Sequence, residues 1–356
     1  MCPQLQYPIA LLSLTLLVAG CAETPKVFRF DNTSQETPKV WPAGTEKPRY
    51  GYIGELTGEN NFRPEKLETR STATKLFEWL TGLAGHNPDP VVLRRPQCGT
   101  VDAEGRIFVT DISRAAVYVF DKPAGQLEIW DRARANVPFV SPIGIALGAQ
   151  GEILVADAEL HSVIRLDRKG NPVGEFGQDI LKRPTGLARD PQRGQVYVAD
   201  TRTHDIKVFT DGGKLLKIIG RRGEGTSEFN SPTHLAFALD KLYVTDTLNS
   251  RIQVLDPDGN VVRKFGKRGL YVGDMVRPKG VAVDSESNIY VIESLYDNLL
   301  VFDNQGRTLL ALGGTGKETG EFYLPSGVWT DSHDQIYISD MFNGRITVLQ
   351  FFGGAQ

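Results

Sequence analysis

The chain has 356 residues, with 40 Lys and Arg against 43 Asp and Glu, and its formal net charge is −3. This near-neutral balance gives no support for nucleic-acid binding, which needs a surplus of positive charge on one surface. No apolar run reaches the roughly 20 residues that a membrane-spanning helix requires.

The first segment is short and apolar, from Ile9 to Val18, and it leads into Val18-Ala19-Gly20-Cys21. This pattern resembles a bacterial lipoprotein signal peptide with its lipobox. The resemblance implies that residues 1–20 are removed and that Cys21 is acylated, for example with palmitate, so that a lipid anchors the chain to a membrane. Because Ala22 rather than Asp follows the cysteine, the resemblance implies sorting to the outer membrane of the cell envelope. Cys21 and Cys98 would then be the remaining cysteines, so we expect no intramolecular disulfide.

Residues 21–48 are rich in Pro, Thr, Glu and Lys, and we expect a flexible tether there. We expect one β-propeller domain over residues 49–356. Its first strand, Tyr50–Glu55, lies in residues 49–64, and this segment resembles residues 311–325, which end one of the sequence repeats described below. The last repeat lacks its own fourth strand, so Tyr50–Glu55 is predicted to close the ring. An insertion follows over residues 63–94, in which Leu76, Leu80 and Leu83 have helical spacing and predict a short helix within Ser71–Gly85.

From residue 95 onward one pattern occurs six times: a proline, a small residue, an apolar strand, a turn, and a second apolar strand that ends in an acid. The prolines are separated by 46, 42, 48, 46 and 47 residues, and each acid lies 14 to 16 residues after its proline. The prolines are Pro96, Pro142, Pro184, Pro232, Pro278 and Pro325, and the acids are Asp111, Asp157, Asp200, Asp246, Glu293 and Asp340. A period in the forties with about four short strands per unit is typical of a β-propeller.

The stretches at residues 277–294, 246–259 and 157–170 resemble the NHL repeat of six-bladed propellers. The sequence therefore predicts an all-β fold: a six-bladed β-propeller of NHL repeats, closed by an N-terminal strand and carrying one helical insertion. Such propellers serve as binding modules, as scaffolds and, in a few cases, as enzymes, so the resemblance leaves the function open.

The first strand of each blade begins, and the second ends, at the same face, where we expect the mouth of the central channel. The candidate binding residues at this mouth are His161, Arg202, His204, His234, Lys279, Glu293, Tyr296 and Phe342. His234 replaces a glycine that four other repeats carry, and Cys98 is the other replacement. The six acids are better explained as acceptors for loop backbone than as metal ligands.

No GxSxG, HExxH, CxxC or P-loop pattern occurs in the chain. The amidating lyase resembles this fold and binds a metal through channel histidines on several blades, but here only His234 is a plausible channel histidine. We therefore expect no catalytic residues, metal or cofactor. The expected function is that of a lipid-anchored envelope module that binds a protein or glycan partner. The alternative is a metal-assisted lyase or hydrolase at the channel mouth.

Overall fold

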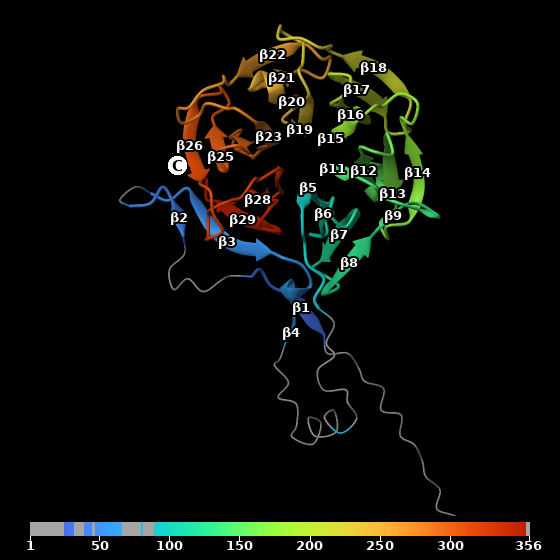
Figure 1. Ribbon diagram of the computed structural model, residues 1–356, viewed down its shortest axis with the longest axis vertical. Helices are drawn as coiled ribbons and strands as arrows, with labels where there is room; N and C mark the ends of the chain where they lie inside the picture. Colours follow the sequence, from blue (N-terminus) through green and yellow to red (C-terminus); the bar gives the residue numbers. More distant parts are fainter. Residues whose placement is uncertain (1–24, 32–38, 45–46, 66–79, 81–88, 354–356) are drawn as a thin grey trace, which may run out of the picture.

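The computed structural model describes residues 25–31, 39–44, 47–65, 80 and 89–353, and their six largest β-sheets are arranged around a central axis (Figure 1). Each of these six sheets is one propeller blade of antiparallel strands, and in the first five blades the strands follow one another in the chain from the axis to the rim. Blade one contains β5 (Pro96–Val101), β6 (Ile107–Asp111), β7 (Ala116–Asp121) and β8 (Gln126–Trp130). Blade two contains β11 (Pro142–Leu147), β12 (Ile153–Asp157), β13 (Ser162–Leu166) and β14 (Pro172–Phe176). Blade three contains β15 (Pro184–Asp190), β16 (Gln195–Asp200), β17 (Asp205–Thr210) and β18 (Leu215–Ile219). Blade four contains β19 (Pro232–Ala238), β20 (Lys241–Asp246), β21 (Arg251–Leu255) and β22 (Val261–Phe265). Blade five contains β23 (Pro278–Val283), β24 (Ile289–Glu293), β25 (Asn298–Phe302) and β26 (Thr308–Gly313). Blade six contains β27 (Val328–Thr330), β28 (Gln335–Asp340), β29 (Arg345–Phe351) and the N-terminal β3 (Tyr50–Leu56).

The position of a strand in its blade determines how its residues are buried. Every residue of the second strands β6, β12 and β24 is buried, because both faces of a blade pack against its neighbours. The outer strand β22 instead alternates half-buried and exposed residues. The core therefore runs around the ring as clusters of apolar side chains between successive blades.

The predicted closing strand is confirmed. β3 pairs with β29 from Leu56 opposite Ile346 to Tyr50 opposite Phe351, so the two ends of the described chain complete the sixth blade. The Arg345 guanidinium contacts the Glu55 carboxylate at 2.7 Å and Asp340 at 2.8 Å, which joins the closing strand to the blade through buried charges. This pairing covers the edge that β29 would otherwise expose.

The predicted tether is wrong in part, since two of its segments form strands. β2 (Val40–Trp41) adds to the outer edge of β3, and β1 (Lys26–Phe28) pairs with β4 (Phe62–Pro64) beside blade one. Both are stabilised by partners that lie later in the sequence, which composition alone does not reveal. Apart from Leu80, the helix predicted within Ser71–Gly85 lies outside the described residues.

The remaining described elements are short. They comprise the hairpin β9 (Arg132–Arg134) with β10 (Val137–Pro138) and three 3-10 turns at Glu59–Asn61, Ala149–Gly151 and Thr247–Asn249. Among the described residues, no helix has the length and apolar character required to cross a bilayer.

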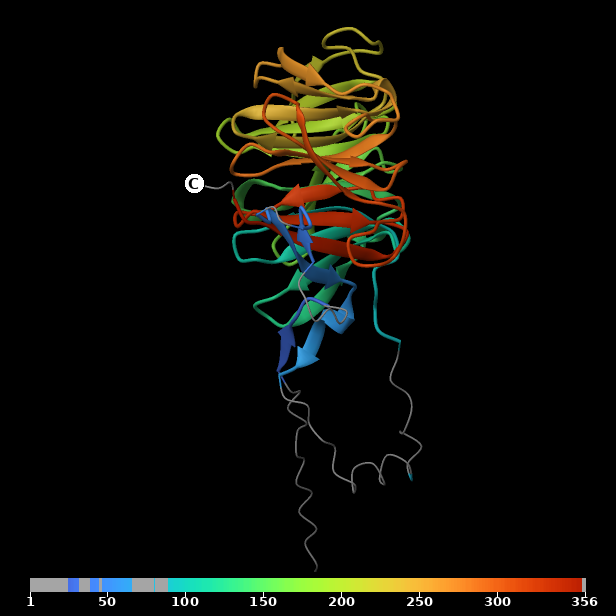
Figure 2. The ribbon, with the colours of Figure 1, turned by 90° about the vertical axis from the view of Figure 1, so that its left-hand side faces the viewer.

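The two faces of the ring differ in which loops they carry. We call the face where each first strand begins the entrance face, and the opposite one the exit face. The third strands, including β29, run toward the exit face, where the described chain ends (Figure 2).

Candidate functional site: the channel and the entrance face

The six repeated acids have one structural role at the entrance face. The Asp157 carboxylate is fully buried and accepts hydrogen bonds from the backbone N–H groups of Val140, Ser141, Glu159 and Leu160 at 2.8–3.1 Å. It thereby ties the start of the first strand to the loop after the second. Asp111 and Glu293 bind the equivalent backbone groups of their own blades. The prediction that these acids bind loop backbone is confirmed by these contacts.

In blades four and six an arginine also binds the repeated carboxylate. The Nε of Arg251 donates to Asp246 at 2.8 Å, and the Nε of Arg345 donates to Asp340 at 2.8 Å. Here the carboxylate binds only one backbone N–H from the segment before the proline, and the guanidinium occupies the other oxygen. None of the six acids is therefore directed freely into the channel.

The position four residues after each acid is left-handed in every blade, with φ between 51° and 64°. This places His161 at φ 56° and His204 at φ 61°, in tight loops at the entrance face. The Nδ1 of His204 accepts the backbone N–H of Ser231 at 3.0 Å, so His204 links blade three to blade four. The geometry gives His204 a structural role, whereas His161 is exposed.

The blades approach one another most closely at the entrance end of the channel. The Thr185 hydroxyl donates to Thr233 O at 3.0 Å, and the Ser326 hydroxyl donates to Gln97 O at 3.0 Å. A Cβ added at Gly144 would lie 2.3 Å from Thr185 O. The glycine of the repeat is therefore required by contact with the backbone of the next blade.

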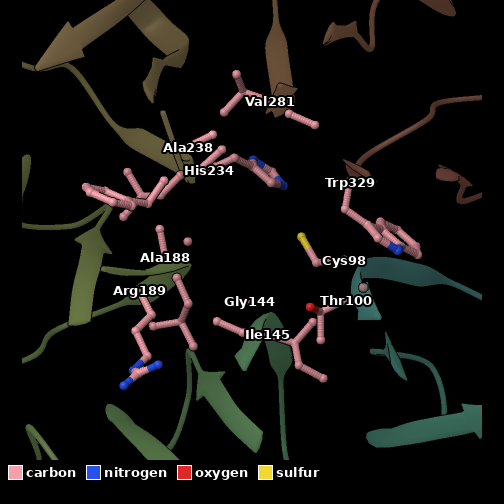
Figure 3. A pocket seen from close by; sticks show the side chains of 18 of the residues that line it. Cys98, Thr100, Gly144, Ile145, Ala188, Arg189, His234, Ala238, Val281 and Trp329 are labelled. Carbon is pink, nitrogen blue, oxygen red and sulfur yellow. The ribbon is translucent and has the colours of Figure 1, made fainter. Parts of the chain in front are cut away.

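A cavity of about 420 Å³ lies on the axis between the first strands of all six blades (Figure 3). It begins at the level of Cys98 and His234 and extends along the strands toward the exit face, where Arg189 and Thr330 line it. The residues directly after the six blade-entry prolines do not line it. The channel mouth that the sequence placed at the entrance face is thus the narrow end, and the hollow part lies beyond it.

Cys98 and His234 are directed into this cavity from different sides (Figure 3). His234 is 7% exposed, its Nδ1 lies 3.0 Å from the Thr233 hydroxyl, and burial together with the Lys279 ammonium lowers its pKa to about 3. Burial also raises the pKa of the Cys98 thiol to about 12 and lowers that of Lys279. Both ring and thiol are therefore neutral at physiological pH. Within the part of the chain that the structure describes, no three His, Cys, Asp or Glu side chains lie close enough together to hold a metal ion.

The other predicted site residues lie outside the cavity. Arg202 is exposed on the entrance face, Tyr296 is half-buried in a loop of blade five, and Glu293 is buried and bound to backbone. Phe342 is exposed and packs against Tyr323, with ring centroids 5.5 Å apart. Of the eight candidates, His234 alone lines the cavity.

Sequence reasoning missed Trp329, Arg189 and Thr100, which also line the cavity. The Trp329 ring stacks on Tyr337 at 5.6 Å, and its buried indole nitrogen has no hydrogen-bond partner. Arg189 pairs with Asp211 at 2.7 Å. These residues follow the blade-entry prolines by four to five positions, and the alternation of a strand could have indicated which of them face the axis.

Comparisons with known proteins agree with this architecture. The NHL-repeat family model matches residues 181–209, and a model described as a 6-bladed beta-propeller matches residues 281–353. The human NHL-repeat-containing protein 4 is 34% identical over 88 residues, which cover 25% of this chain and 67% of the relative. Its mouse counterpart is 39% identical over 77 residues, which cover 22% of this chain and 55% of the relative. The chain thus spans between about half and two thirds of the length of these curated relatives.

Solved structures with the same fold have diverse functions. A virginiamycin B lyase from Staphylococcus aureus matches with a TM-score of 0.55 at 14% identity, covering 90% of this chain and 97% of the lyase. An auxiliary nutrient binding protein from Bacteroides thetaiotaomicron matches with 0.57 at 12% identity, covering 72% and 69% of the two chains. A gluconolactonase from Xanthomonas campestris matches with 0.54 at 17% identity, covering 73% and 89%. At such identities the likeness extends to the fold alone.

Proposed function

We propose that this chain, which belongs to the NHL-repeat family of β-propellers, is a lipid-anchored binding module of the bacterial cell envelope. Its partner is a protein segment or a glycan that enters the channel cavity from the exit face. The observation that carries this proposal is the cavity itself. It combines apolar walls with a few polar groups, as binding sites for small molecules and chain ends commonly do.

Three side chains give the cavity its recognition chemistry. Trp329 is 8% exposed and adds an apolar ring to the cavity wall, held in place by its stacking on Tyr337. His234 is neutral and can accept or donate a hydrogen bond, and Thr330 adds a hydroxyl at the exit end.

The anchor in this proposal is an acyl chain on Cys21. The first described strand, β1, begins at Lys26, so four residues separate the two. At about 3.4 Å per residue, Cys21 lies within about 17 Å of β1 even when the chain is fully extended. An acylated Cys21 would therefore hold the propeller close to the bilayer, and Cys21→Ser would abolish metabolic labelling by palmitate. Labelling of the variant at the level of the parent would contradict the anchor.

Site-specific photocrosslinking in intact cells tests the binding site. A benzophenone amino acid at Ala238, in the cavity, should give a discrete adduct, and the same probe at Val173, on the outer strand β14, should not. Trp329→Ala should remove the adduct at Ala238. Identical adducts from both probe positions would contradict a partner in the cavity.

A second candidate is a metal-assisted lyase or hydrolase at the same cavity. The observation in its favour is that His234 and Cys98, two side chains capable of binding a metal, both line the channel. We favour the binding module because the repeated acids are occupied by backbone and by arginine, so they do not add carboxylates to this pair.

A further inference from the structure

The loop between β22 and β23 exposes three consecutive apolar side chains. Leu270 is 84% exposed, Tyr271 83% and Val272 77%. The loop connects the rim of blade four to the axis of blade five on the entrance face (Figure 1). Exposed apolar groups of this size, next to one another at a loop tip, are uncommon in a folded protein unless they meet another surface.

The base of this loop is well ordered by internal contacts. The Asp274 carboxylate accepts the backbone N–H of Tyr271 at 3.0 Å, and Met275 N donates to Lys267 O at 2.9 Å. Met275 itself is fully buried in the core between blades four and five. The backbone and the loop base therefore hold the three apolar side chains outward.

The same eight-residue loop occurs twice more in the ring, which provides an internal comparison. In residues 222–229 the Glu228 carboxylate accepts Gly225 N at 3.0 Å, and Phe229 is the buried anchor. In residues 315–322 the Glu321 carboxylate accepts Glu318 N at 3.1 Å, and Phe322 is the anchor. In each copy a glycine lies against that carboxylate, at Gly223, Gly316 and Gly269.

The three loops differ most in the character of their tips. The tip of the first copy is Glu224-Gly225-Thr226, and that of the second is Lys317-Glu318-Thr319. Polar tips are therefore fully compatible with this loop fold. The apolar tip of the third copy contributes nothing that folding requires, and its role must lie in contact with another surface.

The charge around the tip indicates which surface this is. Residues 261–273 contain Arg263, Lys264, Lys267 and Arg268 and no acid, and the next residue, Asp274, is buried against the loop backbone, with its carboxylate 3.8 Å from the Lys267 ammonium. The Lys267 side chain is 79% exposed. The apolar tip protrudes and includes a tyrosine, and Lys and Arg side chains lie at the base of the loop. These are features of segments that insert into the interface of an anionic bilayer.

We propose that Leu270, Tyr271 and Val272 form a finger that inserts into the surface of an anionic lipid membrane, with Lys267 and Arg268 at the level of the headgroups. The finger acts independently of any acyl group on Cys21. It orients the entrance face toward the lipid, so that the exit end of the cavity faces the aqueous phase. Other exposed groups of the entrance face, Leu248, Leu295 and Arg202, then also lie toward the membrane.

The test uses the full chain carrying Cys21→Ser, so that no acyl group contributes. The triple variant Leu270→Glu/Tyr271→Gly/Val272→Thr gives this loop the tip of residues 224–226. The equivalent loop of residues 222–229 folds with that tip. The matched control, Leu216→Thr/Ile218→Thr, removes exposed apolar groups from the outer strand β18. We expect the tip variant to bind vesicles of phosphatidylcholine mixed with phosphatidylglycerol about tenfold more weakly than the parent, and the control to bind like the parent.

A second readout reports insertion directly and does not depend on total binding. In Tyr271→Trp, brominated acyl chains should quench the added tryptophan in vesicles that contain phosphatidylglycerol, and the parent spectrum provides the baseline. An unquenched Trp at 271, or a tip variant that binds as tightly as the parent, would overturn the proposal. A finger that docks into a protein groove would give that unquenched result.

Discussion

Asp157→Asn tests whether the repeated acid holds each blade entrance in place. The substitution keeps the size of the side chain but replaces one acceptor oxygen with a donor NH2 group. In the structure, Oδ2 accepts Val140 N at 2.8 Å and Ser141 N at 3.1 Å, while Oδ1 accepts Ser141, Glu159 and Leu160. With the amide nitrogen in place of Oδ2, Val140 N loses its acceptor and the new NH2 faces N–H groups.

The magnitude follows from these contacts. A buried donor left without a partner costs about 1–3 kcal/mol, and the variant creates two, the Val140 N–H and the amide NH2. Partial relaxation and residual access to water reduce the sum, so we expect the free energy of unfolding to fall by about 2–4 kcal/mol. The exposed neighbour Glu159 provides the control, and Glu159→Gln should change the free energy by less than about 0.5 kcal/mol.

Urea denaturation followed by circular dichroism measures both variants. A midpoint for Asp157→Asn that coincides with those of the parent and of Glu159→Gln would refute the assigned role of the acid. The same substitution at Asp111 should have a similar effect, since its carboxylate binds the equivalent backbone groups.

Two further predictions concern the channel and the closing strand. Because burial lowers the pKa of His234 to about 3, the unfolded chain binds a proton below its usual pKa of 6.5 that the folded chain does not bind. Stability of the parent should therefore fall with decreasing pH below about 6.5, by up to about 1.4 kcal/mol per pH unit. In thermal unfolding measured across this pH range, the stability of His234→Gly should depend less steeply on pH, and the substitution should lower the free energy of unfolding at neutral pH by about 0–2 kcal/mol. An equal pH dependence of stability in parent and variant would exclude a buried neutral imidazole. Glu55→Ala leaves Arg345 paired with Asp340 alone and should cost about 2–4 kcal/mol, and an unchanged urea midpoint would show that the closing strand does not depend on this ion pair.

The fold could be predicted from the sequence because each repeat carries its own local signals. A proline starts the first strand, an acid ends the second, and a short run of β-branched and aromatic residues such as Val196–Val198 predicts a buried strand. The closing strand followed from the missing fourth strand of the last repeat. β1 and β2 could not be predicted, because they depend on pairing with residues 62–64 and 50–51 rather than on apolar residues of their own.

The site was harder to predict for a physical reason. The repeat period shows which residues begin each blade, but it does not show at which end the blades approach most closely. The ladder register shifts just after the blade-entry proline, as between Pro278 and Val281, and contacts such as Gly144 with Thr185 narrow the entrance end. Residues two or more positions after the proline therefore line the hollow part. The apolar finger could have been found by aligning the three loops that end in Glu228–Phe229, Asp274–Met275 and Glu321–Phe322.

Metal analysis of the purified protein distinguishes a channel that serves binding from one that serves metal-assisted catalysis. Elemental mass spectrometry should be performed on the parent and on His234→Gly, each purified without chelator and then dialysed. For a binding channel we expect no stoichiometric divalent ion in the parent and the same trace content in the variant. One tightly held divalent ion per chain in the parent, lost in His234→Gly, would contradict the binding role and establish a metal site in the channel.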